Sequence, residues 1–195
     1  MSLFLHDNIF HQMRFQLLSN LWNRYPVGFA PQTHNLILCG NIGRLSEHKG
    51  FETVKLVNEL SQGFKQVYWV PGYAEIHTQC GQPIDMQCVL DFCTTFTRAN
   101  ILCNNVHAFG DKTLVASLGQ TVEDLVFMHE NCNSMDSILL TPTSVVSKKA
   151  RWILSGQPNG ANVNLNFTLR NQSRQIVTNS ATDKGFHPNI VFELH

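Results

Sequence analysis

Four short apolar runs, each stopped by a glycine or a proline, constrain the fold of this chain more than any other feature. They are residues 35–40 (NLILCG), 67–72 (VYWVPG), 138–142 (ILLTP) and 152–156 (WILSG). Continuous apolar runs of this length, bounded by turn residues, are typical of strands that are buried on both faces. We therefore expect the core to be built around buried strands.

The first half of the chain also carries helical patterns between these runs. Residues 1–10 are expected to give a short strand, and apolar residues recur at helical spacing from Met13 until Pro26 ends the pattern. Ser46 is expected to cap a second helix that runs towards Gly63, and Asp85 a third helix that runs to about Ala99. The expected inner faces hold Met13, Leu17, Leu18, Leu21, Trp22 and Tyr25 in the first helix, Phe51, Val54, Val57 and Leu60 in the second, and Val89, Leu90, Cys93 and Phe96 in the third.

From Asn100 onwards the apolar period changes to two, which indicates strands. Residues 100–119 are expected to form strands around a turn at Gly110 and Asp111, and residues 162–170, 174–179 and 189–194 add further strands. Strand and helix units followed by consecutive strands favour packed sheets flanked by helices. No composition shift marks a boundary, so residues 1–195 are expected to form a single domain.

The charge composition argues against nucleic acid as a partner and favours other proteins. Lysine plus arginine equals aspartate plus glutamate, at 14 each, so no net charge attracts a polyanion. Charged residues are only 14 % of the chain, while asparagine occurs 18 times and glutamine 12 times. Since charge is depleted where protein interfaces are buried, this surface suits a subunit covered by its neighbours.

The six cysteines and the N-terminal residues indicate the compartment. The cysteines contain no Cys-x-x-Cys pair and are expected to be buried free thiols. No signal-like N-terminus and no apolar run long enough to span a bilayer are found, so no membrane insertion is expected. The expected location is cytoplasmic, or within a particle assembled inside the cell.

In order and spacing, the four runs and the residues directly after them resemble the strand ends of the calcineurin-like metallophosphoesterases. The matching segments are NLILCGNIG, VYWVPGYAE, ILLTPTS and WILSGQPNG, followed by VTNSATDKGF. The family's strand ends read Gly-Asp, Gly-Asn-His-(Asp/Glu), a His-rich segment and Gly-His-x-His. The resemblance implies an α/β fold of two packed mixed β-sheets flanked by α-helices.

The same resemblance implies that the metal ligands of the family have been lost. A binuclear centre holds two metal ions about 3.5–4 Å apart, and it needs carboxylate, imidazole and amide ligands. Here Asn41 stands where the family has its bridging aspartate, while Tyr73 and Ala74 replace the Asn-His pair. Thr143 replaces a histidine, and Gln157 and Asn159 replace the two histidines of Gly-His-x-His. No metal and no other cofactor is therefore expected.

The N-terminal Asp-x-His of the family is also missing from the first strand expected in this chain. His6 and Asp7 are neighbours in LFLHDNIF, and neighbouring residues on a strand point to opposite faces. His6 and Asn8 share a face, but two such weak donors do not make a binuclear site. Asn41 is interpreted as the remnant of a bridging carboxylate, kept with its glycines for the geometry of the turn.

The resemblance and these losses predict a catalytically inactive member of the family. It is expected to act as a structural or scaffolding subunit in a larger protein assembly. A virus particle is one such assembly, and a surface of low charge would suit it. One alternative is a residual phosphodiesterase with a single metal at some combination of His6, Asn41 and Asn159. A second is a module that binds a nucleotide or a peptide in the vacated groove, since neutral amides bond ligands without a metal.

Two further features invite a functional interpretation. His129 and Cys132 lie three residues apart, but no third group can be named to orient them as a nucleophilic pair, and a surface histidine beside a packed thiol is the favoured interpretation. Trp69 is expected in the core. Tyr73 either fills the vacated groove or lies in an exposed aromatic patch.

Overall fold

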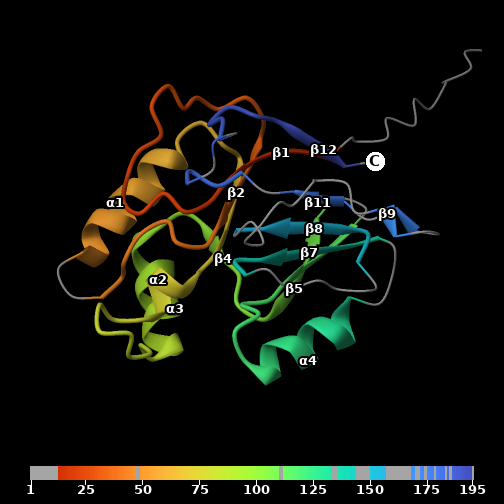
Figure 1. Cartoon of the computed structure of the whole chain (residues 1–195). Coiled ribbons are helices and arrows are strands. Elements are labelled where there is room, and N and C mark those ends of the chain that lie inside the picture. Colours follow the sequence, from red (N-terminus) through yellow and green to blue (C-terminus); the bar gives the residue numbers. More distant parts are fainter. Residues whose placement is uncertain are drawn as a thin grey trace, which may run out of the picture.

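The structure, a computed structural model, describes residues 13–46, 49–109, 112–132, 136–143, 150–156, 168–169, 172–173, 175–177, 179–182, 184 and 186–194. Its described elements are arranged around two mixed five-stranded sheets (Figure 1). The expectation of an α/β fold with two mixed sheets is confirmed at this level.

The first sheet has the order β12-β1-β2-β3-β4, and its four N-terminal strands are parallel. The strands are β1 (Met13–Leu18), β2 (Asn35–Cys39), β3 (Gln66–Val70) and β4 (Asn100–Ile101), with β12 (Phe192–Leu194) antiparallel to β1. Figure 1 shows β12, in dark blue, beside β1, in red, so that the two ends of the described chain meet in one sheet.

The second sheet has the order β11-β8-β7-β6-β5 and the same pattern of one antiparallel edge strand. Its strands are β5 (Asn105–Phe109), β6 (Lys112–Ala116), β7 (Ser137–Thr141), β8 (Trp152–Ser155) and β11 (Gln175–Val177), of which β5 is the antiparallel one. A separate two-stranded pair joins β9 (Thr168–Leu169) to β10 (Gln172–Ser173).

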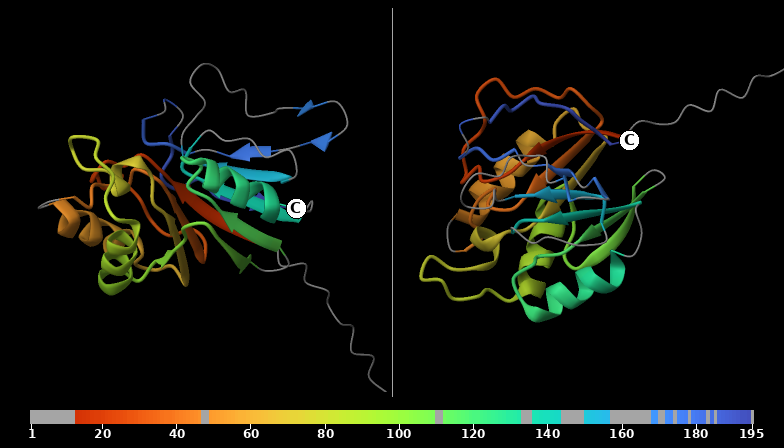
Figure 2. Two further views of the ribbon diagram at one scale, coloured as in Figure 1. Left: turned by 90° about the horizontal axis from the view of Figure 1, so that it is seen from below. Right: turned by 45° about the vertical axis from the view of Figure 1, so that its right-hand side comes forward.

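Helices cover both outer sides of the paired sheets. The first three are α1 (Gly50–Leu60), the short α2 (Tyr73–Ile76) and α3 (Met86–Phe96), and they lie on the side of the first sheet, whereas α4 (Val122–Asn131) packs on the second (Figures 1 and 2). Among the described residues, no helix combines the length and the apolar character needed to cross a membrane.

One apolar core joins the two sheets. It contains Leu38 and Trp69 from the first sheet and Leu140 and Leu154 from the second. Cys39 shows how closely the sheets approach, because its Sγ lies 3.1 Å from the carbonyl oxygen of Thr141 in the other sheet. A smaller cluster on the outer face of the second sheet packs Val115, Leu139 and Ile153 against Met128 and Cys132 of α4 and its C-cap.

The helix expected from Met13 to Pro26 is wrong, because residues 13–18 form strand β1. Phe15 and Leu17 alternate with Arg14 and Gln16, and the strand gains ladder bonds to β2 and β12. Gln16 is buried, yet its amide donates to the Ala30 carbonyl (3.1 Å) and accepts from Gln32 N–H (2.7 Å). Tertiary pairing therefore outweighs the local helical spacing.

The other expected helices are correct in place but differ in their details. Asp85 caps α3 by accepting from the N–H groups of Gln87 and Cys88, as expected. Ser46 does not cap α1, which begins at Gly50 after Lys49. The expected inner residue Phe51 is 65 % exposed, and Phe96 is 45 % exposed.

Several expectations from the sequence lie outside the described residues. They are the strand at residues 1–10, the turn at Gly110 and Asp111, and most of the alternating segment at residues 162–170.

Candidate functional site

The carboxyl ends of strands from both sheets meet at one point. Gly40 follows β2 with a left-handed φ of +73°, and a Cβ added there would lie 2.5 Å from Cβ of Pro142, which follows β7. A Cβ added at Gly156, after β8, would lie 2.1 Å from the Cys39 carbonyl oxygen. The absence of a side chain at Gly40 and Gly156 therefore lets the ends of β2, β7 and β8 lie in direct contact.

Asn41 lies in this contact and its amide is bonded on both sides. The residue has a φ of +52°, which asparagine tolerates better than most residues, and it is 2 % exposed. Its Oδ1 accepts from Ala74 N–H at 2.9 Å, and its Nδ2 donates to Asn20 Oδ1 at 2.8 Å. The side chain therefore fixes the loop after β2 to the loops after β1 and β3.

Asn20 is the partner that the sequence analysis missed. It follows β1 with a φ of +55°, and its Nδ2 donates to the Gly156 carbonyl at 2.6 Å and to Ser180 Oγ at 2.8 Å. The signal was present in the sequence, since LLSN and LCGN both end an apolar run with a small residue and an asparagine. The two amides connect the first sheet to the end of β8 and to the C-terminal segment.

Glu75 is the only carboxylate among the described residues of this network, and it is buried. As the third residue of α2 it reaches back to the Gly72 N–H at 2.7 Å, in the manner of a capping box. The same oxygen, Oε2, accepts from Asn41 N–H at 2.9 Å, and Oε1 accepts from Gly43 N–H at 3.0 Å. Glu75 thus ties the loop after β2 to the loop after β3.

Burial and hydrogen bonding act on Glu75 in opposite directions. Removal from water disfavours the carboxylate and raises its pKa, while the backbone N–H donors favour the carboxylate and lower the pKa. Burial is the larger effect, so the pKa of Glu75 lies above its ordinary value. The pKa of the Cys39 thiol is raised mainly by burial. The negative charge of Glu75 raises it further.

The structure brings three of the expected site residues together around α2. Ala74 is buried beside Asn41, whereas Tyr73 is 51 % exposed and its ring stacks on His77 at a centroid distance of 3.9 Å. Tyr73 therefore lies on the surface and does not fill a vacated groove. Trp69 is fully buried, so its expected place in the core is confirmed.

Thr143 is half-buried and bonded within the protein. Its Oγ1 lies 3.1 Å from Thr141 Oγ1 and 3.3 Å from the carbonyl oxygens of Leu118 and Gly119. It thereby ties the end of β7 to the loop after β6. Gln157 and Asn159, like His6, Asp7 and Asn8, lie outside the described residues.

The donor set at the described strand ends does not fit a binuclear metal centre. Asn20 and Asn41 are neutral amides, and they form hydrogen bonds with each other and with the backbone. Both oxygens of Glu75 accept backbone N–H groups. Nowhere in the described part of the chain do three metal-ligating His, Cys, Asp or Glu side chains come together.

The cysteines follow the expectation only in part. All six lie among the described residues and none is in a disulfide. Cys39, Cys93 and Cys132 are buried, whereas Cys80 and Cys88 are exposed. Cys103 has intermediate exposure. The expectation of buried thiols is therefore wrong for Cys80 and Cys88. Cys132 is fully buried at the end of α4 while His129 is exposed, in line with a surface histidine beside a packed thiol.

Comparison with known proteins does not place the chain in a family. No family model matches it, and no curated protein matches its sequence.

Proposed function

We propose that this chain is a catalytically inactive, metallophosphoesterase-like protein that serves as a structural or scaffolding subunit of a larger protein assembly, such as a virus particle. The proposal joins the resemblance of the strand-end motifs to the chemistry of the residues that now occupy them.

The bonding of Asn41 supports the inactive state most directly. In the family that the sequence resembles, this strand end carries a bridging aspartate that serves two cations. Here Asn41 is neutral, buried, and satisfied by Asn20 and Ala74. Asn20, which follows β1, is a second amide whose bonds stay within the protein. The position that the resemblance gives to the bridging aspartate thus holds loops together.

The exposed apolar side chains of α4 support a role in an assembly. Val122, Leu125 and Val126 recur at helical spacing and are 71 %, 41 % and 49 % exposed. Apolar side chains gathered on one helix face are a mark of protein contact surfaces. The low charge of the whole chain agrees with such contacts.

Metal content and turnover test the inactive state. Protein purified without chelator is equilibrated with excess manganese and zinc, and its metals are measured by mass spectrometry. The same sample is assayed with bis(4-nitrophenyl) phosphate. We expect neither stoichiometric metal nor turnover. Two metals per chain, with turnover that stays with the protein through gel filtration, would overturn the proposal.

The scaffold role needs a separate measurement. A tagged chain is purified from the cells in which the assembly forms, and the stoichiometry of the complex is measured by native mass spectrometry. We expect a defined complex with other subunits. A thermal-shift screen with nucleotides runs beside it, and we expect no stabilisation. A monomer stabilised by a nucleotide would instead favour a ligand-binding module.

A further inference from the structure

A groove of adjoining hollows runs along the amino edge of the first sheet and past the C-terminal ends of α1 and α3. It consists of three adjoining hollows of about 460, 460 and 430 Å³. The first and second share Gly63, and the second and third share Ser61, Gln62 and Arg98. Asn35, Gln66 and Asn100, which line it, are the first residues of β2, β3 and β4. Because these strands are parallel, the groove lies at the opposite end of the sheet from Asn41.

Basic side chains line this amino-edge groove, and no carboxylate from the described residues does. Lys65 and Arg98 share the central hollow, both are exposed, and neither makes an ion pair with a described residue. His34 and Arg14 line the first hollow. Lysine and arginine do not outnumber aspartate and glutamate in the chain as a whole, so the groove concentrates positive charge locally.

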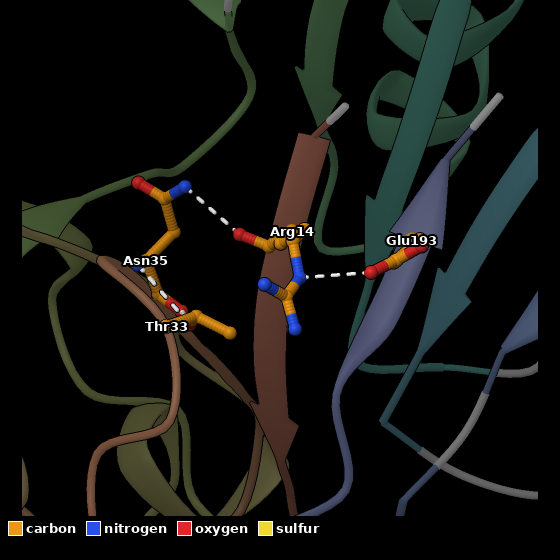
Figure 3. A network of polar contacts seen from close by, with 4 residues as sticks. All are labelled: Arg14, Thr33, Asn35 and Glu193. Carbon is orange, nitrogen blue, oxygen red and sulfur yellow. Dashed lines mark hydrogen bonds and ion pairs between the residues drawn. The ribbon is translucent and has the colours of Figure 1, made fainter. Parts of the chain in front are cut away.

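The end of the groove at β1 is fixed by polar contacts. Arg14 Nε lies 2.8 Å from Glu193 Oε1 of β12, and Asn35 Nδ2 donates to the Arg14 carbonyl at 3.0 Å (Figure 3). The charge of Arg14 is therefore balanced by Glu193. Lys65 and Arg98 remain available to an incoming anion.

Uncharged amides line the groove together with the basic side chains. Gln32, Gln62 and Gln66 are exposed along the groove and offer both donors and acceptors to a peptide backbone. Neighbouring strands are about 4.8 Å apart, so the edge from β1 to β4 spans about 14 Å, the length of about four extended residues. Two cations among several neutral amides suit a short acidic peptide better than the dense phosphates of a nucleic acid.

We propose that the amino-edge groove binds an extended acidic peptide segment of a partner subunit, with Lys65 and Arg98 pairing to its carboxylates. This proposal rests on the scaffold role proposed above and gives it a specific surface. It places partner recognition at the edge of the sheet that lies away from the closed strand ends.

Fluorescence anisotropy at low salt tests the proposal. The probe is a fluorescein-labelled octapeptide of alternating glutamate and serine, and the comparison probes replace glutamate by glutamine or use a short oligothymidylate of equal charge. The double variant Lys65→Gln/Arg98→Gln is compared with Lys55→Gln/Arg24→Gln, which removes two exposed cations outside the groove. Circular dichroism checks that both variants fold.

We expect saturable binding of the acidic peptide, weakened about tenfold or more in the groove variant and less than about twofold in the control variant. Equal weakening in both variants would show only a diffuse charge effect and would overturn the proposal. So would oligothymidylate binding as tight as the peptide, or no binding of the peptide. If peptide binding fails while the chain still purifies with stoichiometric partners, the groove is wrong and the scaffold role stands.

Discussion

At the scale of single residues, the Asn41 side chain has a structural role, because its amide joins loops from different strand ends. A carboxylate at this position needs a cation, whereas the amide finds both a donor and an acceptor in the loops around it. The sequence drew attention to Asn41 because the flanking glycines mark a turn. It did not reveal the partner Asn20, because that residue falls in a segment whose spacing imitates a helix.

Asn41→Asp is expected to destabilise the protein. The new carboxylate would place an oxygen against Asn20 Oδ1, which now accepts a bond, and would bury a second charge near Glu75. Burying an unpaired charge and breaking a buried bond costs about 2–4 kcal/mol. The measurement is the free energy of unfolding in urea.

The control for this variant is Asn189→Asp, which removes an exposed bond from Asn189 Nδ2 to the Gly28 carbonyl. We expect it to lose less than about 1 kcal/mol. Both proteins are also unfolded with manganese present. If manganese restored Asn41→Asp to the stability of the unchanged protein, the strand ends would still hold a metal, and our account of the donor set would be wrong.

Glu75 predicts a pH dependence of stability with a defined sign. Because its folded pKa lies above the ordinary value of 4.5, the folded state keeps this proton to a higher pH than the unfolded chain does. The contribution of Glu75 is therefore fully present below pH 4.5 and is lost as the pH rises through the folded pKa. The stability advantage of the unchanged protein over Glu75→Gln is expected to shrink with rising pH.

Thermal unfolding from about pH 4 to about pH 8 measures this advantage. Glu59→Gln, which removes an exposed partner of Lys55, is the control and is expected to show little change over the same range. An advantage that grew with pH would mean that the three N–H donors hold the pKa of Glu75 below its ordinary value, contrary to our assignment.

At the scale of elements, strands that are buried on both faces were predictable, whereas β1 and α4 were not. β2, β3, β7 and β8 lie at the apolar runs because both of their faces need apolar side chains. β1 was missed because its ladder partners are distant in sequence. The local apolar pattern was thus enough to predict β2, β3, β7 and β8, whereas β1 depends on pairing with distant strands.

α4 was missed for a different reason. Its buried residues are only Asp124 and Met128, so it lacks the apolar inner stripe by which a helix is recognised. The available signal was the capping box, in which Thr121 accepts from Asp124 N–H and Asp124 accepts from Thr121 N–H. The apolar residues of α4 that face solvent belong to the proposed assembly surface, not to the core.

Gly156→Ala tests the contact between the ends of the strands. A Cβ at this position would lie 2.1 Å from the Cys39 carbonyl oxygen and 3.0 Å from Cα of Pro142, and both neighbours are backbone. Relief requires the two sheets to move apart, so we expect a loss of about 3 kcal/mol or more, or failure to fold. The free energy of unfolding and the yield of folded protein are measured together.

Gly28→Ala is the matched glycine variant. Gly28 has a φ of +74° but nothing within 4 Å of the added Cβ, so the substitution costs only backbone strain, about 1–2 kcal/mol. Gly156 has no left-handed φ, so a loss at Gly156 no larger than that at Gly28 would mean that the close approach of the sheets costs less than we expect.

At the scale of the whole molecule, the two sheets share one core, and a second cluster adds α4 to the outer face of the second sheet. Cys39 lies between the sheets, Cys93 lies on the buried face of α3, and Cys132 is the buried C-cap of α4. Burial raises the pKa of the Cys93 thiol to about 12 and that of Cys39 further. Each buried thiol therefore reports the opening of a different layer of the fold.

Thiol labelling with a maleimide, read at each cysteine by mass spectrometry, tests whether these layers form one cooperative unit. We expect Cys80 and Cys88 to react at once because they are exposed, and Cys39, Cys93 and Cys132 to be protected. In moderate urea the three protected thiols should converge on one rate set by global unfolding, because both apolar clusters share the second sheet. If Cys132 stayed faster than Cys39 and Cys93 at every urea concentration, the layer under α4 would open by itself, and the chain would not unfold as a single domain.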